Sequence, residues 1–174
     1  RLYGILACNS TGTLTDAKLM NNQLPDVGGA YNEFGMYVWG RDAPYNIDNR
    51  AHFGITDVTF QDLGRVAILA HDWTELDVDQ STFTKTEADF GYAVELGSAS
   101  IGSFTNNTFT EFDTRALSDN SASGGLYIEN CFTNTIVDPI TKDVLISGNT
   151  FNTNNYGILI GNENVNYAGN VDIN

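Results

Sequence analysis

Short apolar segments recur along the chain at intervals of roughly 20 to 30 residues, which is the sequence signature of a repeat architecture. They occupy residues 4–7, 35–38, 66–69, 91–94, 115–117, 135–137 and 157–160. A more polar series runs between them, and each of its members ends in a phenylalanine. These phenylalanines are Phe60, Phe83, Phe109, Phe132 and Phe151. A chain with this pattern is expected to stack one repeating unit on the next.

The repeated segments have the properties of β-strands rather than of helices. They are short, rich in β-branched and aromatic residues, and separated by clusters of Gly, Asn, Asp and Ser that are typical of turns. A coil of about 20 to 30 residues that holds two or three strands corresponds to one rung of a parallel β-helix. The sequence therefore predicts an all-β fold, a single-stranded β-helix solenoid of about seven rungs. We expect it to form one domain over residues 1–174, which could be a segment of a longer protein.

Stacked rungs place equivalent residues above one another, so the repeat also predicts columns of side chains. The expected inward aliphatic column is Ala7, Val38, Leu69, Val94, Leu117, Val137 and Ile160. The phenylalanines form a second inward column. Two residues before them stand Val58, Ser81, Asn107, Asn130 and Asn149. This turn column predicts an asparagine ladder, in which side-chain amides satisfy the turn backbone along the stack.

The segment ISGNTFNTNNYGILIGN, residues 146–162, resembles the short repeat of the right-handed parallel β-helix superfamily of pectate-lyase-like proteins. The resemblance covers nearly the whole chain and is clearest from Ile55 onward. It implies a right-handed β-helix. Many members of that superfamily cleave or bind polysaccharides, and others are viral tailspikes, adhesins and surface proteins. The repeat specifies the fold and leaves the chemistry open.

The residues that alternate with the inward column are expected to face outward, and none of them is charged. They are Leu6, Tyr37, Ile68, Ala93, Ala116, Ile136 and Leu159. An apolar stripe of this size is normally covered. Long loops could cover it, the alternation could be misassigned, or the stripe could be a subunit interface. We also find no obvious cap at either end of the repeat, and open strand edges favour assembly into a homo-oligomer or filament.

Charge restricts the partners of the chain. Lys and Arg total 8 against 22 for Asp and Glu, which gives a formal net charge of -14. Such a chain repels phosphate backbones and anionic membrane surfaces, and it has no apolar run of about 18 residues. We therefore expect no nucleic-acid partner and no membrane insertion. An acidic, Lys-poor composition rich in Asn, Thr and Gly is common outside cells, so we expect an extracellular location or one on a cell or virion surface.

The first two coils are the longest, with their extra length in loops at residues 21–34 and 40–53. Insertions in a solenoid often mark the working face. These loops and the neighbouring coil supply aromatic and hydrogen-bonding side chains that could hold a sugar ring. The candidates are Trp39, Arg41, Asp42, Tyr45, His71, Asp72 and Trp73. The alternative is that the loops bind nothing and Trp39 packs against Trp73.

Catalytic candidates are weaker than binding candidates. Asp42 and Asp72 could form the carboxyl pair that glycoside hydrolysis requires. A polysaccharide lyase would instead need a basic residue, such as Lys85, Arg41 or His71. No catalytic signature of the resembled superfamily is present, nor any phosphate-binding loop or metal motif.

We expect no metal site and no cofactor, although calcium could bind outward acidic pairs. These pairs are Asp77 with Asp79 and Asp57 with Glu129. Exposed acidic groups more commonly form a solvated face.

The sequence thus favours a structural protein, extracellular or on a surface, whose β-helix assembles with copies of itself through the apolar stripe and the uncapped ends. The alternative is a β-helix that binds or degrades polysaccharide, such as a tailspike-like depolymerase, lyase or glycoside hydrolase.

Overall fold

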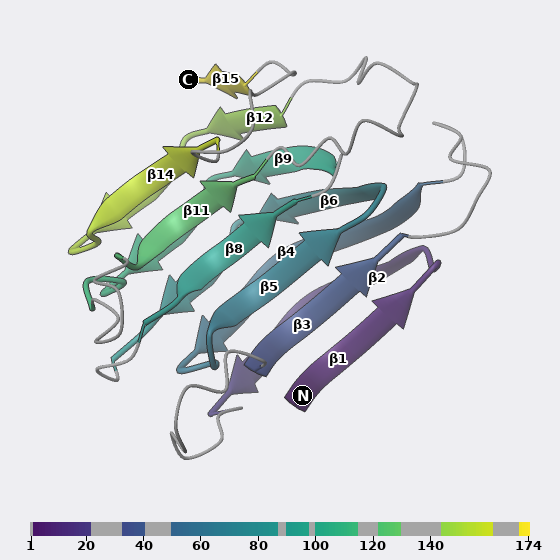
Figure 1. Ribbon diagram of the computed structural model, residues 1–174, viewed down its shortest axis with the longest axis horizontal. Helices are drawn as coiled ribbons and strands as arrows, with labels where there is room; N and C mark the ends of the chain where they lie inside the picture. The colour runs from purple at the N-terminus through teal and green to yellow at the C-terminus, as the bar shows by residue number, and fades with distance from the viewer. Residues whose placement is uncertain are drawn as a thin grey trace.

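The computed structural model describes residues 2–21, 33–40, 50–86, 90–97, 100–114, 122–129, 144–161 and 171–174. These residues form two parallel β-sheets, one of six strands and one of nine. We call the six-stranded sheet, which faces the viewer in Figure 1, the front sheet, and the other the back sheet.

The front sheet takes one strand from each successive turn of the chain. Its strands, in spatial order, are β1 (Leu2–Cys8), β3 (Glu33–Trp39), β5 (Val66–His71), β8 (Tyr92–Leu96), β11 (Gly124–Ile128) and β14 (Tyr156–Ile160). Neighbouring strands pair in parallel throughout. This confirms the predicted parallel stack.

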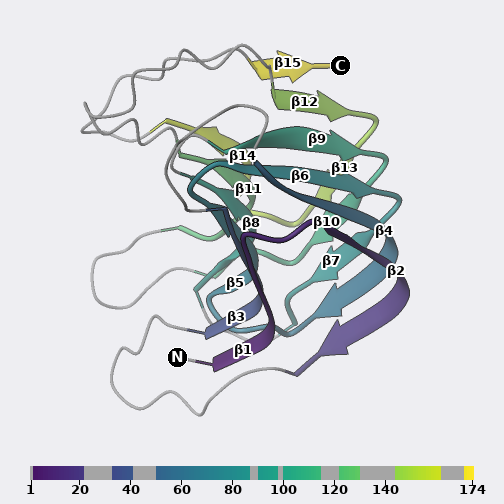
Figure 2. The same cartoon turned by 90° about the vertical axis from the view of Figure 1, so that its right-hand side faces the viewer.

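The back sheet contains strands that follow each front strand along the chain, as the side view in Figure 2 shows. They are β2 (Gly12–Met20), β4 (Ala51–Gln61), β6 (Thr74–Asp79), β7 (Thr82–Thr84), β9 (Ile101–Thr105), β10 (Thr108–Thr110), β12 (Val144–Ser147), β13 (Thr150–Asn152) and β15 (Val171–Ile173). The long strand β4 pairs with β6 through its first half and with β7 through its second half. From that rung onward, a turn divides the back strand in two.

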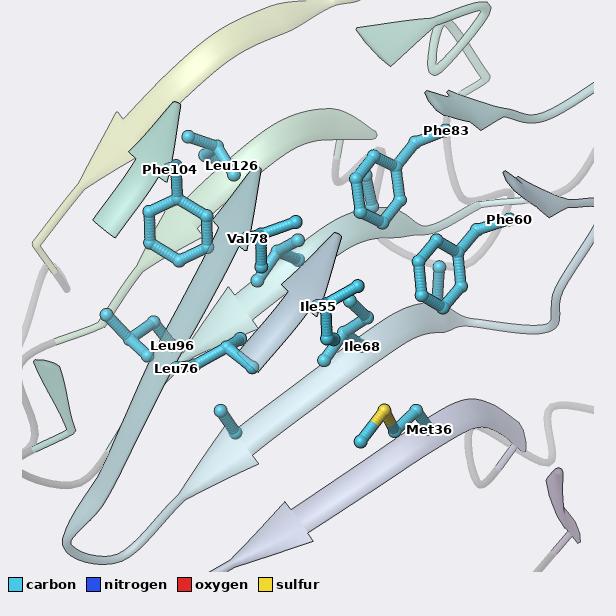
Figure 3. Packing of buried hydrophobic residues seen from close by; sticks show 14 of the residues in the cluster. Met36, Ile55, Phe60, Ile68, Leu76, Val78, Phe83, Leu96, Phe104 and Leu126 are labelled. Carbon is cyan, nitrogen blue, oxygen red and sulfur yellow. The ribbon is translucent and has the colours of Figure 1, made fainter. Parts of the chain in front are cut away.

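The predicted phenylalanine column is present. Phe60 and Phe83 are buried in the core (Figure 3), Phe109 is fully buried as well, and Phe151 is partly buried against them. The rings of Phe60, Phe83, Phe109 and Phe151 stack with centroid separations of 4.7, 5.0 and 4.9 Å. Phe132 lies outside the described residues. Because β10 pairs directly with β13, Phe109 and Phe151 are neighbours, so the predicted place of Phe132 between them is wrong.

The bend in the back strands repeats one backbone conformation in five rungs of the described part of the chain. Residues with positive φ occupy equivalent positions at this turn, namely Asp16, Asp57, Gln80, Asn106 and Gly148. Asp and Asn tolerate this left-handed conformation better than most residues, and glycine tolerates it best. The turn residues of the sequence therefore fix where each back strand bends.

The predicted ladder follows directly after this turn. The Val58 amide donates to Ser81 Oγ at 3.2 Å, the Ser81 amide to Asn107 Oδ1 at 2.9 Å, and the Asn107 amide to Asn149 Oδ1 at 2.8 Å. Asn107 Nδ2 also donates to the Val78 carbonyl at 2.9 Å. Buried turn groups are thus satisfied along the stack, as predicted; Asn130 lies outside the described residues.

The outward stripe predicted on the front sheet is partly wrong. Ile68 and Ala93 have no exposed surface and belong to the main core. The register predicted for β5 is wrong by one residue, because Tyr37 pairs with Leu69 and not with Ile68. A slip of one residue moves a side chain to the opposite face. Leu69, predicted to point inward, is accordingly absent from the main core and belongs to a second apolar cluster with Phe34, Val66, Phe90 and Tyr92.

The paired outer column of the front sheet is Leu6, Tyr37, Leu69, Glu95, Tyr127 and Leu159. The predicted residues Leu6, Tyr37 and Leu159 lie in it, whereas Ala116 and Ile136 lie outside the described residues. The apolar segments predicted from the sequence do not include strand β11, so Tyr127 was not predicted in this column. The predicted count of about seven rungs stays a prediction.

The outer face of the front sheet is also largely covered within the single chain. Phe34, Leu69 and Tyr92 are only 7 to 8% exposed, and Val66 is fully buried. Leu6 is the exception at 54%. An open apolar patch running the length of the sheet, as the sequence predicts, is therefore not found among the described residues.

Asn107→Ala tests the ladder. The substitution leaves the Ser81 amide and the Val78 carbonyl without their buried partner, and each such loss costs about 1 to 3 kcal/mol. We expect the free energy of unfolding, measured by urea denaturation, to fall by about 2 kcal/mol or more. Asn152→Ala, on the exposed side of β13, should change it by less than about 0.5 kcal/mol. Equal effects of the two substitutions would contradict a structural ladder.

Candidate functional site

Polar and aromatic side chains gather on the outer face of the front sheet, near the carboxyl ends of β3, β5, β8 and β11. Trp39 and His71 are direct partners in the pairing of β3 with β5. Gly97 and Glu129 occupy the equivalent positions in the next two rungs, because each directly follows the paired residues Leu96 and Ile128. Side chains alternate along a strand, so Glu95, two residues before Gly97, shares this face. We call Trp39, His71, Asp72, Glu95 and Glu129 the carboxyl-end strip.

Three of the predicted sugar-binding residues lie together in this strip. Trp39 Nε1 donates to Asp72 Oδ2 at 2.7 Å, which fixes the indole beside the carboxylate. The Trp39 ring also stacks on Tyr37, with a centroid separation of 6.3 Å and an interplanar angle of 9°. His71 adjoins Trp39 across the strand pair. The arrangement places an aromatic surface beside hydrogen-bonding groups.

Trp73 does not contribute to this surface. Its side chain is 3% exposed, and the Arg50 guanidinium lies 4.4 Å from its ring centroid. Burial lowers the pKa of Arg50, and the nearby Glu75 opposes that shift. Trp73 is therefore an interior residue that packs against a cation. The remaining candidates Arg41, Asp42 and Tyr45 lie outside the described residues, as does any pairing of Asp42 with Asp72.

His71, Glu95 and Glu129 form a compact cluster. One nitrogen of the imidazole and one oxygen of each carboxylate all lie within 4.8 Å of one another. Glu95 is only 8% exposed, and its Oε2 atom has no hydrogen-bond partner among the residues that the structure describes. Burial raises the pKa of the Glu95 carboxyl group; Arg65 and His71 lower it, and Glu129 raises it further. A buried carboxylate oxygen without a hydrogen bond is costly, which makes this cluster a candidate for chemistry or binding.

Sequence reasoning missed Glu95 as a site residue, and named Glu129 only in a different pair. The signal was present, since Glu95 is the one charged residue in the buried strand Tyr92–Leu96. Glu95 was overlooked because the predicted outer column contains Ala93 at this strand, whereas the strand pairing places Glu95 there.

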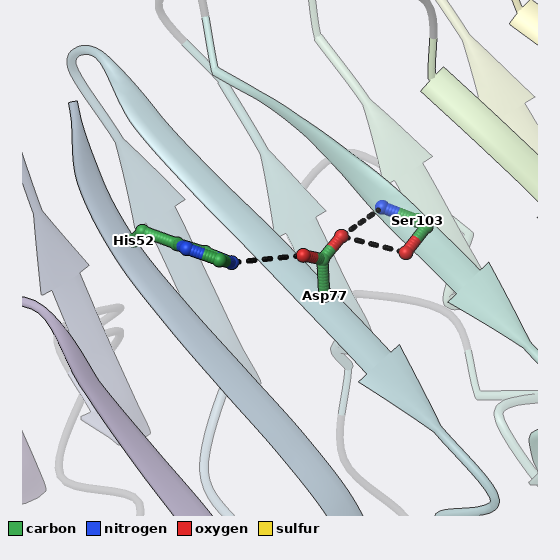
Figure 4. A network of polar contacts seen from close by, with 3 residues as sticks. All are labelled: His52, Asp77 and Ser103. Atoms are coloured by element: carbon green, nitrogen blue, oxygen red, sulfur yellow. Dashed lines mark hydrogen bonds and ion pairs between the residues drawn. The ribbon is translucent and has the colours of Figure 1, made fainter. Parts of the chain in front are cut away.

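A second cluster of titratable groups lies on the back sheet (Figure 4). His52 Nε2 lies 2.8 Å from Asp77 Oδ2, and these side chains are 47% and 39% exposed. Ser103 donates to Asp77 Oδ1 through its amide at 3.0 Å and its hydroxyl at 2.6 Å. Glu75 completes the group. The protein itself thus supplies donors to Asp77, and calcium binding there stays a prediction.

Comparison with known proteins identifies the family. The family model of the right-handed β-helix region matches residues 45–174, and the chain belongs to this family. No curated protein and no solved structure matched the chain. Among the described residues there is no helix long and apolar enough to cross a membrane.

The buried Glu95 predicts a specific pH dependence of stability. Below about pH 4.3 the carboxyl group is protonated in both the folded and the unfolded chain. As the pH rises, the unfolded chain loses this proton first, because folding raises the pKa. The folded state then binds more protons, so stability falls with rising pH until the folded pKa is passed.

Glu95→Gln removes this contribution. The unfolding free energy of the variant should rise relative to wild type by about 1.4 kcal/mol for each pH unit that separates the two pKa values. Urea denaturation between pH 4 and 8, with EDTA present, measures this difference. Glu111→Gln, which removes a charge from an exposed side chain, serves as the control. A difference between wild type and Glu95→Gln that does not change with pH would refute the assignment.

Proposed function

We propose that this protein is a structural β-helix that associates with further copies of itself end to end, outside the cell or on a cell or virion surface. The observation that carries the proposal is where the exposed large apolar side chains lie. They are Leu6, Met20, Leu145, Tyr156, Ile160 and Ile173. Leu6 and Met20 belong to β1 and β2 at one end of the described stack, and Tyr156, Ile160 and Ile173 belong to β14 and β15 at the other. Leu145 lies on β12, which β15 covers.

The exposed residues at the second end continue inward columns of the core. Ile160 pairs with the buried Ile128, and Ile173 pairs with the buried Ile146. They are 40% and 56% exposed because no further described strand lies over them. A rung from a second copy would bury these side chains and pair the open strand edge. Such head-to-tail contact is heterologous and can extend into a filament.

The assembly surface in this proposal differs from the one that the sequence suggested. The central part of the outer stripe is already buried within the chain, so the ends offer more apolar surface to a partner. The acidic, Lys-poor composition supports the location outside cells or on a surface.

Association should respond to salt in a way that follows from the charge. Copies with a net charge of -14 repel one another, and about 0.1 M salt screens charges beyond about 10 Å. We therefore expect the molar mass from size-exclusion chromatography with light scattering to rise with both protein concentration and salt.

The double variant Ile160→Asp/Ile173→Asp should remain a monomer under the same conditions. Thr82→Asp, which adds a charge at an exposed position in the middle of the stack, is the matched control and should associate like wild type. A wild-type protein that stays monomeric at all concentrations and salt levels would rule out the proposal.

A second candidate function is polysaccharide binding at the carboxyl-end strip. The observation that favours it is the Trp39 ring, stacked on Tyr37 and held by Asp72, because aromatic faces beside hydrogen-bond acceptors suit sugar rings. The negative charge of the chain favours neutral polysaccharides over acidic ones.

Trp39→Ala should weaken binding to a neutral polysaccharide by at least about tenfold in affinity electrophoresis, because a buried aromatic contact is worth more than about 1.4 kcal/mol. Tyr156→Ala removes an exposed aromatic group elsewhere on the front sheet and should have no effect. Assaying the same mixtures for reducing sugar and unsaturated ends tests the catalytic alternative. Equal binding by wild type and Trp39→Ala would exclude this strip as the sugar site.

A further inference from the structure

We propose that His71, Glu95 and Glu129 form a binding site for a divalent transition-metal cation of the zinc type. The proposal does not rest on the end-to-end assembly. Its three ligands belong to the carboxyl-end strip, but it does not require that the strip binds sugar. It rests on the position of three ligand groups, on the space that Gly97 provides, and on the buried state of Glu95.

The stacking register brings the three ligands together. His71 ends β5, Glu95 lies in β8, and Glu129 directly follows β11. These three strands are consecutive in the front sheet, and their register places all three residues on its outer face. Glu129 occupies the same column as His71, two rungs away, and Glu95 lies in the adjacent column on the rung between them. One ligand atom from each side chain falls within 4.8 Å of the other two. A tetrahedral ion with bonds of about 2.1 Å needs little more than rotamer adjustments to engage all three.

Gly97 makes this approach sterically feasible. It stands between His71 and Glu129 in their column, and the imidazole lies over it. A Cβ atom added at Gly97 would come within 2.5 Å of His71 Nε2. Any larger residue would therefore force the His71 ring to move from its present position.

Glu95 supplies an independent indication of a ligand. Glu95 is only 8% exposed. Its Oε2 atom contacts neither solvent nor a hydrogen-bond donor among the described residues. A carboxylate left in this state is strongly disfavoured unless a positive charge compensates it. Arg65 and His71 contribute favourable charge, but Glu129 adds a second negative group. A bound dication would neutralise both carboxylates and give Glu95 Oε2 a partner.

The donor set indicates which cation fits. Imidazole nitrogen is a good ligand for zinc and neighbouring transition metals, whereas calcium and magnesium prefer oxygen ligands alone. One imidazole with two carboxylates leaves a fourth tetrahedral position for water or another ligand.

The cluster of His52, Glu75 and Asp77 provides an internal comparison. It has the same types of ligand atoms at similar separations, but its aspartate already accepts bonds from Ser103 and contacts His52. It is also exposed. Substitutions there provide the control for adventitious binding by surface carboxylates.

The experiment uses the full chain without a histidine tag, stripped with EDTA and titrated with zinc chloride by calorimetry. We expect one zinc ion per chain, a higher thermal midpoint with zinc, and visible ligand-field bands with Co²⁺. Glu95→Gln and Glu129→Gln should each weaken zinc binding by about 10- to 100-fold or more, since even outer-shell changes cost that much. Gly97→Ala should weaken it while leaving every ligand in place.

Asp77→Asn should bind zinc as wild type does. No zinc binding by the wild-type chain would overturn the proposal, as would binding that survives Glu95→Gln or disappears in Asp77→Asn. Circular dichroism verifies that each variant is folded. If Glu95→Gln does not fold, the half-buried Glu129→Gln decides the matter.

Discussion

The in-register stacking of parallel rungs is the constraint on which the rest of this structure depends. Each rung lies about 4.8 Å from the next, so a residue type suited to one position is repeated above and below it. Phe60, Phe83 and Phe109 stack ring on ring for this reason. The side chains of Ser81 and Asn107 likewise accept hydrogen bonds from backbone amides of the neighbouring rung. Contacts between successive rungs therefore both bury these apolar side chains and supply hydrogen-bond partners to these turn amides.

Features that depend on local turn chemistry could be predicted from the sequence. The phenylalanine column and the ladder through Ser81, Asn107 and Asn149 follow a regular spacing, because the left-handed turn before them accepts few residue types. The rung period and the parallel pairing follow from the same spacing. These features required only that equivalent turns be aligned.

Features that depend on the precise register of the front sheet could not be predicted. At β5, Ala67 and Ile68 both belong to the core, so strict alternation fails there. The sequence alignment assumed strict alternation and placed Ile68 outside and Leu69 inside. A single-residue error of this kind exchanges the two faces of a strand, and the apolar outer stripe was overestimated as a result. Strand β11 was missed because the short apolar segments at residues 115–117 and 135–137 were taken as the repeats between β8 and β14.

The candidate site shows the same division. Trp39, His71 and Asp72 are close in the sequence pattern and were predicted together, and the structure brings them into contact or adjacent positions. Glu95 and Glu129 join them only through the register of β5, β8 and β11. In a solenoid, a site of this kind takes one ligand from each rung, so it becomes visible only when the columns are known.

The most direct test of this dependence on register is a crystal structure of the protein with zinc, recorded with anomalous scattering at the zinc absorption edge. We predict an anomalous peak among His71, Glu95 and Glu129, with Leu69, Glu95 and Tyr127 in one outward column. A structure in which Glu95 points into the core, or in which the column of His71 and Glu129 is out of register, would contradict it.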